Sequence, residues 1–375
     1  MLANRRTVRE DAAVDSEAED LLDGLEGKAR AARQRFIERL TAEGFTLQEL
    51  RDAAAENRLA LLPVERVLGG SHTARETAER AGLPLETVLR IRRLLGRPEA
   101  GPDDAVFSED DVEAAVATKG FLEAGFDEGA IFEITRVLGE GMARLSAAVV
   151  AAFADTFLAA GDSEGEVAER FAALAQELMP ALTPVLVAAL RGHLRDSVGR
   201  GVLGLAELAS GDVAGSQELC VCFADLVGFT RLGVEVEPTE LGSVAGAFAQ
   251  LATSVTAEPV RLIKTIGDAA MFVSPDARAL VGVALDFVQA VADAKLPSLR
   301  AGIALGPALQ RAGDYYGNSV NLASRVTGVA RPGSVLCTKE VRDAAGEEGL
   351  LWSSAGRHRL KGLARTVPLY RARRA

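Results

Sequence analysis

Three short segments place charged or amide side chains within otherwise apolar sequence, and their residue types are suited to chemistry. They are Phe223–Thr230, Ile263–Asp268 and Asp314–Arg325. A buried charge is costly unless it is paired or bound to a metal. Three such placements within one domain-sized stretch indicate a shared purpose. A site for metal ions and a triphosphate would provide one.

Two aspartates are candidate metal ligands. Asp225 ends an apolar stretch typical of a strand, and Asp268 lies in a predicted turn between two strands. Carboxylates from adjacent strands can hold two hard cations about 3.5–4 Å apart, one activating a ribose hydroxyl and the other bridging phosphates. A single aspartate at a strand end is more often a turn or cap, so the full set of motifs is what favours a metal site.

Two other features suit a polyanion. Gly228-Phe229-Thr230 opens a predicted helix, whose free amides and dipole attract phosphate. Asn321 and Arg325 are four residues apart on another predicted helix, so they share a face. A guanidinium is suited to the charge that develops on a phosphate during transfer.

These motifs also carry a family resemblance. FADLVGFT, KTIGD and D-x₆-N-x₃-R, in this order, resemble the catalytic signature of the class III nucleotidyl cyclases over roughly Gln217 to Arg373. The long N-terminal half and its junction look most like the soluble, pH-sensing adenylyl cyclases of actinobacteria. The likeness is specific because three separated motifs occur in the family's order.

The resemblance implies roles for the catalytic residues. Asp225 and Asp268 would bind two Mg²⁺ or Mn²⁺ ions per site, with the Leu226 carbonyl as an added ligand. Asn321 and Arg325 would contact the ribose and the transition-state phosphate. In this family the metal ligands and the base-selecting residues come from different subunits. Since one chain carries both sets, we expect a homodimer with two equivalent sites.

The resemblance also implies how the purine is chosen. Lys264 can meet adenine N1, and Asp314 can accept from the exocyclic amine, a pair that matches adenylyl rather than guanylyl cyclases. An ordinary ion pair is the alternative. Arg311 and Lys361 are further triphosphate candidates, for which a surface charge is the alternative.

Composition narrows the class of protein. The 375 residues are 48% hydrophobic and 25% charged, a balance typical of globular proteins with two or more domains. Residues 1–210 carry a net charge of −13 and residues 211–375 one of +2, for −11 overall. The acidic first half argues against nucleic-acid binding, which needs a basic face.

Targeting signals and cysteines favour a cytoplasmic location. No apolar segment follows the first basic residues, so no signal peptide is expected. The longest apolar run, Leu145–Ala160, is too short to span a bilayer and predicts a core helix, so no membrane span is expected. Cys220, Cys222 and Cys337 are interpreted as small buried hydrophobes in a reducing compartment rather than as metal ligands.

The N-terminal half is helical in pattern. Ser16–Leu40 predicts a helix with Gly24 and Gly27 as weak points, and Thr46 with Glu49 forms a capping box.

Thr73–Leu95 predicts helix, turn at Gly82, and helix, and resembles the helix-turn-helix of MerR-type proteins. Its arginines Arg90, Arg92 and Arg93 would then read DNA. A small scaffold reused for packing is favoured instead, because the surrounding half is acidic and fold alone does not give function.

Long helices connect to the second half. Ile131–Leu178 predicts two Ala-rich helices, of a kind that usually packs against a partner, and Met179–Gly199 predicts a third. His193, flanked by Arg191 and Arg195, is a candidate pH switch because imidazole titrates near physiological pH. A solvated histidine with no role is the alternative.

We expect a helical regulatory domain at 1–200, a linker at 201–216 and a catalytic domain at 217–375. In the catalytic domain strands are predicted at Glu218–Ala224, Val260–Thr265, Ala269–Ser274, Leu299–Leu309, Ser334–Thr338, near Leu351 and at Val367–Arg371. Helices are predicted at Pro238–Thr256, Asp276–Ala294, Ser319–Val329 and Lys339–Ala345. This is an α+β, ferredoxin-like pattern after an all-helical region.

The favoured function is an adenylyl cyclase that converts ATP to 3′,5′-cyclic AMP and pyrophosphate and is inhibited by its N-terminal domain, with pH as a candidate signal. One alternative is a helix-turn-helix transcription regulator with a nucleotide-sensing, cyclase-like domain. Another is a catalytically silent nucleotide-binding module, against which the complete set of six key residues argues.

Overall fold

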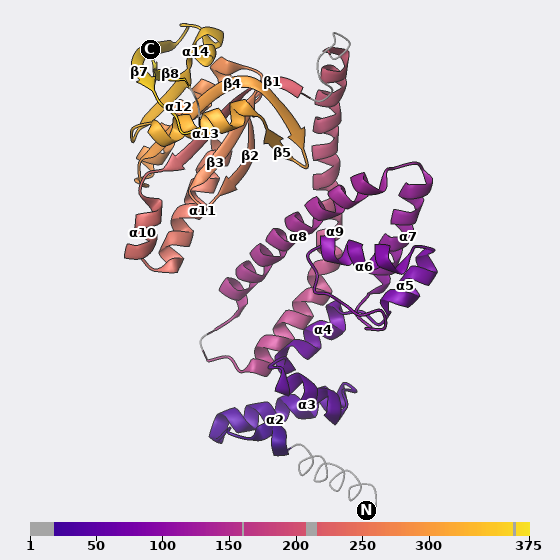
Figure 1. Cartoon of the computed structure of the whole chain (residues 1–375). Helices are drawn as coiled ribbons and strands as arrows, with labels where there is room; N and C mark the ends of the chain where they lie inside the picture. The colour runs from indigo at the N-terminus through magenta and orange to yellow at the C-terminus, as the bar shows by residue number, and fades with distance from the viewer. Residues whose placement is uncertain (1–18, 160, 208–215, 363–364) are drawn as a thin grey trace, which may run out of the picture. The chain divides into compact units, whose positions relative to one another are not determined.

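The chain folds into two compact units, Met1–Leu203 and Gly204–Ala375. The computed structural model describes residues 19–159, 161–207, 216–362 and 365–375 (Figure 1). The described part of the first unit is helical, and the second combines a mixed sheet with helices. The predicted α+β fold class with a helical N-terminal region is thereby confirmed.

The first unit is a succession of helices whose starts the sequence specifies well. The predicted capping box at Thr46 with Glu49 forms, and a second one is present at Thr73 with Glu76. Gly82 adopts the left-handed conformation between the two helices of the helix-turn-helix-like segment. The elements are η1 (Glu19–Leu22), α2 (Gly27–Ala42), α3 (Leu47–Ala55), η2 (Leu59–Leu61), α4 (Leu62–Leu68), α5 (Ala74–Ala81), α6 (Leu85–Leu94), α7 (Glu109–Glu123), α8 (Glu128–Phe157) and α9 (Glu164–Glu207).

The continuous helix predicted over Ser16–Leu40 is wrong. Its described part is a single 3₁₀ turn, η1, followed by α2. Gly24 and Gly27 have φ angles of 76° and 55°, a left-handed conformation that a helix interior does not tolerate. The two glycines therefore act as breaks rather than as weak points.

The separate helix predicted from Met179 is also wrong, because α9 runs without interruption through Pro180 and Pro184. A proline removes one helical hydrogen bond. Both prolines are exposed, so water can satisfy the carbonyls that they leave unpaired. The helix continues to Glu207, within the segment expected as the linker, and residues 208–215 lie outside the described part of the chain.

The apolar helix α8 is not the core helix that the sequence predicted. Its buried residues are Ile131, Phe132, Gly139 and Phe153, whereas Leu138 and Val150 are about half exposed. Two helical segments are long enough and apolar enough to cross a membrane, judged by length and composition alone: Glu128–Phe157 and Glu164–Val198. An apolar helix surface of this kind is equally suited to being covered by another protein surface.

The second unit is built on one sheet with the strand order β2-β3-β1-β4-β6-β8-β7, in which β5 pairs with β4. Neighbours are antiparallel except for β4 and β6. The strands are β1 (Ser216–Leu226), β2 (Arg261–Ile266), β3 (Ala269–Ser274), β4 (Leu299–Arg311), β5 (Asp314–Tyr316), β6 (Ser334–Thr338), β7 (Leu350–His358) and β8 (Val367–Arg374). The helices are α10 (Phe229–Glu235), α11 (Pro238–Ser254), α12 (Ala277–Asp293), α13 (Asn318–Val329) and α14 (Lys339–Ala345).

Alternation along β1 sorts its side chains between two cores. Cys220 and Cys222 pack in the larger core, which includes α12, while Leu219 and Val221 pack in a second core with α13. All three cysteines are free and buried, as predicted, and burial raises the pKa of Cys220 to about 12. By the same alternation Asp225 lies on the α13 face of the sheet.

Candidate functional site

The two predicted metal aspartates lie at one end of the sheet. Asp225 pairs across the ladder with Ala269, the residue after Asp268, and the Leu226 amide donates to the Asp268 carbonyl at 3.0 Å. Burial, with the neighbouring Asp225 carboxylate as a further cause, raises the pKa of Asp268. The structure therefore brings two half-buried carboxylates together, and their mutual repulsion favours a bound cation.

Arg300 is a third charged group at this point, and sequence reasoning missed it. It lies opposite Asp225 on β4, and its Nε and Nη2 atoms donate to Asp225 Oδ2 at 3.0 and 2.6 Å. One guanidinium beside two carboxylates leaves one negative charge uncompensated. The available signal was an arginine inside the apolar run Leu299–Leu309, the same argument that identified Asp225.

The residues fit a divalent metal only in part. Carboxylate and carbonyl oxygens are the ligands that Mg²⁺ and Mn²⁺ prefer. Within the described residues, no group of three or more His, Cys, Asp or Glu side chains could hold a metal ion. A metal at Asp225 and Asp268 would therefore take its other ligands from backbone oxygens, such as that of Leu226, from water and from substrate phosphates.

Lys264 and Asp314 form an ion pair, with 30% and 31% of their side chains exposed. Lys264 Nζ donates to Asp314 Oδ2, and Asp314 Oδ1 accepts from the Tyr315 amide at 2.8 Å. The pair joins β2 to β5, a short strand that the sequence did not predict. Because both side chains remain partly accessible, they can exchange this contact for one to a substrate.

Helix α13 carries Asn321 and Arg325, as predicted, and packs closely on the sheet. A Cβ atom built on Gly302 would lie 2.2 Å from the Thr327 amide nitrogen, and Thr327 Oγ1 donates to the Phe223 carbonyl at 3.0 Å. The absence of a side chain at Gly302 on β4 thus lets the helix approach β1, the strand that carries Asp225. Asn321 is exposed and Arg325 half-buried.

The weaker triphosphate candidates differ in their surroundings. Lys361 is exposed, and a Cβ atom on Gly362 would lie 3.3 Å from Arg325 Nη2, so the Lys361–Gly362 turn lies beside Arg325. Arg311 is exposed and lies opposite Asp314 in the β4–β5 ladder.

The segment after Asp225 opens a helix, as predicted. Gly228 has a φ of 82° and precedes α10, which begins at Phe229. Only glycine adopts this conformation without strain. Thr230 is exposed in the first turn. The helix has seven residues, so its dipole adds little to the attraction that its free amides provide.

In the first unit, two of the three arginines that the alternative assigned to DNA reading, Arg90 and Arg92, make packing contacts, whereas Arg93 is exposed. Arg92 is 8% exposed and donates to the Pro98 and Val106 carbonyls at 3.0 and 3.3 Å. The guanidinium of Arg90 lies 4.0 Å from the centre of the Phe132 ring. These contacts favour the packing scaffold over the transcription regulator.

His193, the candidate switch, is exposed on α9 in the first unit. The adjacent Arg195 and Asp196 form an ion pair at 3.8 Å.

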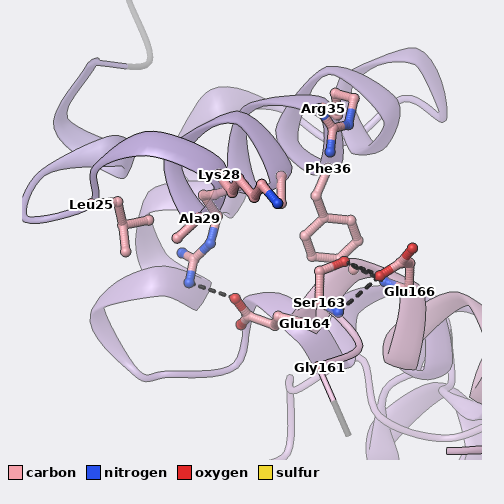
Figure 2. Close-up of a pocket in the computed structure, with 12 residues that line it drawn as sticks. Leu25, Lys28, Ala29, Arg35, Phe36, Gly161, Ser163, Glu164 and Glu166 are labelled. Carbon is pink, nitrogen blue, oxygen red and sulfur yellow. Dashed lines mark hydrogen bonds and ion pairs between the residues drawn. The ribbon is translucent and has the colours of Figure 1, made fainter. Parts of the chain in front are cut away.

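A cavity of 410 Å³ lies in the first unit between α2 and the start of α9 (Figure 2). Lys28 and Phe36 line one side and Ser163 the other. Arg33 Nη2 donates to Glu164 Oε2 at 2.5 Å, so two of the lining charges neutralise each other. The contacts fasten α2 to α9. Glu166 Oε2 accepts from both the amide and the hydroxyl of Ser163, at 2.8 and 2.7 Å, so this pair caps the start of α9.

Comparison with known proteins gives matches over both units. Residues 14–198 match the family model of the adenylate cyclase regulatory domain, and residues 212–371 match that of the adenylate and guanylate cyclase catalytic domain. The chain is 40% identical over 370 residues to the pH-sensitive adenylate cyclase MT1302 of Mycobacterium tuberculosis, covering 96% of this chain and 92% of that protein.

A second curated relative, an adenylate cyclase of Streptomyces coelicolor, is 34% identical over 286 residues, which cover 75% of this chain and 74% of that protein. Among solved structures, the adenylyl cyclase CyaB of P. aeruginosa aligns with 43% of this chain and 96% of its own, at 22% identity and a TM-score of 0.40.

Proposed function

The chain belongs to the adenylate cyclases that carry an N-terminal regulatory domain, and from this premise we propose how its residues divide the work. ATP would be converted to 3′,5′-cyclic AMP and pyrophosphate at sites shared between two copies of the chain. The observation that carries the proposal is the presence, on one sheet and the turn between two of its strands, of the carboxylate pair Asp225/Asp268 and the polar pair Lys264/Asp314.

The metal role falls to the carboxylate pair. Asp225, Asp268 and the Leu226 carbonyl would hold Mg²⁺ or Mn²⁺, which when bound lowers the pKa of the ribose hydroxyl and neutralises phosphate charge. Arg300, already hydrogen-bonded to Asp225, would turn to the triphosphate once cations take over that carboxylate. Arg311 and Lys361 are further candidates for phosphate binding, and the amides after Gly228 would face the same phosphates.

The remaining roles concern the nucleotide itself. Lys264 and Asp314 would read the purine through N1 and the exocyclic amine, since guanine presents N1–H and O6 instead. Asn321 would orient the ribose. Arg325 would stabilise the charge that develops at the α-phosphate as the 3′-oxygen attacks and pyrophosphate leaves. The bond from the 3′-oxygen to the α-phosphorus forms as the bond from the α-phosphorus to pyrophosphate breaks, and the proton of the 3′-hydroxyl is released.

A homodimer would complete the sites. The described contacts join Asp225 to Arg300 and Lys264 to Asp314, but no described contact joins the two groups. Beside them, Ile266 at the end of β2 is 63% exposed, and Tyr316 at the end of β5 is 55% exposed. Exposed apolar side chains at such positions are suited to burial against a second copy of the chain. That contact would bring the Asp225 site of each chain to the Lys264/Asp314 pair of its partner.

Regulation is proposed to come from the N-terminal unit, as inhibition at neutral pH that acidification relieves. A relative of 40% identity is itself described as pH-sensitive. The domain boundaries we propose remain 1–200, 201–216 and 217–375. ATP as substrate, together with three buried free thiols, favours a cytoplasmic location.

Complementation tests the shared sites. Asp225→Ala and Lys264→Ala chains are each expected to be nearly inactive, because each lacks a residue that both sites need. Mixed in equal amounts, half of the dimers would contain one chain of each kind and one intact site, so about a quarter of wild-type activity should return. Absence of recovery in heterodimers isolated with two different affinity tags would contradict the shared site.

A further inference from the structure

A β-bulge on β2 places two cations on the same side of the sheet. The register with β3 shifts between Leu262 and Lys264, so that Arg261 pairs with Val273 and Lys264 with Met271. Residues three apart on a regular strand face opposite sides, whereas Val273 and Met271, two apart, share one. The bulge therefore brings Arg261 onto the face that carries Lys264.

Arg261 uses this placement to hold a buried tyrosine. Its Nη2 atom donates to the hydroxyl oxygen of Tyr315, and its guanidinium lies 5.5 Å from the centre of that ring. Tyr315 is 3% exposed, and its hydroxyl donates in turn to Gln310 Oε1 at 3.0 Å. The phenol thus has both an acceptor and a donor role satisfied, as a buried hydroxyl requires.

The tyrosine is directly linked to the pair proposed to read the base. Its amide donates to one carboxylate oxygen of Asp314, and Lys264 donates to the other. Strand β5 has three residues and pairs with β4 alone, so it has little rigidity of its own. Two side-chain links tie it to β2: Lys264 to Asp314, and Arg261 to Tyr315.

We propose that Arg261, Tyr315 and Gln310 form a positioning network that sets the purine selectivity of this cyclase. A substrate base must exchange hydrogen bonds with Lys264 and Asp314, which loosens the first link between β2 and β5. The second link, from Arg261 to Tyr315, keeps β5 in place during that exchange. The network does not touch the nucleotide, and the inference rests on the proposed base-reading role of Lys264 and Asp314.

The test measures kcat and KM for ATP and GTP with the full-length protein. Tyr315→Phe removes only the hydroxyl, and Arg261→Met keeps most of the aliphatic length. Loss of one hydrogen bond should lower kcat/KM for ATP by about fivefold, mainly through a higher KM, and leave kcat/KM for GTP unchanged. Because both variants break the same link, the double variant should lose little more than either one alone. Arg261→Lys, which retains a donor, should restore part of the loss.

Two controls separate selectivity from stability. Arg342 lies on α14 with its guanidinium 4.2 Å from the ring centre of Tyr370, a comparable contact outside the network. Arg342→Met should leave the ATP-to-GTP ratio of kcat/KM unchanged. A variant that merely destabilised the fold would reduce kcat for both nucleotides equally, and thermal melting would detect it. If Arg261→Met fails to fold, Tyr315→Phe decides alone.

Variants of Lys264 and Asp314 distinguish the positioning network from the base-reading role on which it rests. If Lys264→Met and Asp314→Asn lower the ATP-to-GTP ratio while Tyr315→Phe and Arg261→Met do not, the positioning network is wrong and base reading stands. If Lys264→Met and Asp314→Asn leave the ratio unchanged, the base-reading assignment itself is wrong. A fall in the ratio for all four supports both.

Discussion

In the catalytic unit, several key charged residues are half-buried on strands, and neighbouring strands fix their direction. Asp225 and Arg300 expose 26% and 28% of their side chains. In the N-terminal unit, ion pairs such as Arg58 with Glu65 lie at the surface, with 39% and 45% of their side chains exposed. Exposed pairs contribute about 0–1 kcal/mol, so that unit depends on helix packing instead. Substitutions that remove a charge should therefore damage the second unit most. Substitutions that change the size of a packed side chain should damage the first unit most.

The largest effect is expected for the carboxylate pair. Asp268→Ala should reduce cyclic AMP formation to below about a hundredth of wild type. The variant removes a ligand of the cation, and a bound cation stabilises the transition-state charge by several kcal/mol. We expect Mn²⁺ to raise the melting temperature of the wild type, and Asp268→Ala should abolish that rise. The fold should survive, since the raised pKa of Asp268 indicates that its charge is not stabilised by the protein alone.

The matched control is Asp286→Ala. Asp286 pairs with Arg374 on the surface of the same unit, with 55% of its side chain exposed. Activity and the response to Mn²⁺ should stay within twofold of wild type, as roughly expected for an exposed pair. More than a few per cent residual activity in Asp268→Ala would remove the metal assignment.

Shape is tested in the first unit at Gly139, where α8 crosses α6. A Cβ atom there would lie 2.6 Å from Leu95 Cα, whereas one on Gly141 of the same helix would meet no atom within 4 Å. Gly139→Ala should destabilise the unit by about 1–3 kcal/mol through overpacking. Gly141→Ala should stabilise it by up to about 1 kcal/mol through helix propensity.

Urea unfolding of the two full-length variants measures this difference. Cyclic AMP formation at neutral pH should rise for Gly139→Ala, because a loosened regulatory unit inhibits less. Equal stability of the two variants would show that α6 and α8 can separate without cost. Equal activity despite unequal stability would show that inhibition does not depend on this packing.

The same contrast explains which features the sequence could predict. Apolar alternation and turn residues located β3, β6 and α14 to the residue, because buried strands leave little freedom of register. The cyclase family followed from three motifs, and the comparisons confirm it. Roles for the individual site residues remain predictions.

The missed features depend on contacts distant in sequence. Strand β5 is too short for a periodic pattern and exists because Tyr315 is buried against β2. Arg300 could be recognised as a site residue only from the strand pairing that places it opposite Asp225. On α9, local rules for proline were overridden because Pro180 and Pro184 are exposed and their neighbours still form helical hydrogen bonds.

The smallest effect is expected at His193, on α9 in the part of the first unit that leads to the second unit. An exposed imidazole between Arg191 and Arg195 would add a third positive charge to one stretch of α9 when protonated. Because like charges repel, acidification should disfavour a state of the protein in which His193, Arg191 and Arg195 lie close to other cations. We expect that state to be the inhibited one, so activity should rise as pH falls. A group whose pKa differs by one unit between two states shifts their ratio about tenfold.

The measurement compares pH–activity profiles of the wild type, His193→Gln and the isolated 211–375 chain. Inhibition relieved by acid should appear in the wild type, shift or flatten in His193→Gln, and be absent from the isolated chain, which lacks the regulatory unit. His358→Gln is the matched control, because His358 lies on β7 with its Nε2 atom 3.0 Å from the Ala355 carbonyl oxygen. Its profile should follow the wild type. Coincidence of the first three profiles would mean that neither His193 nor the N-terminal unit responds to pH, and the regulatory unit would then need a different signal.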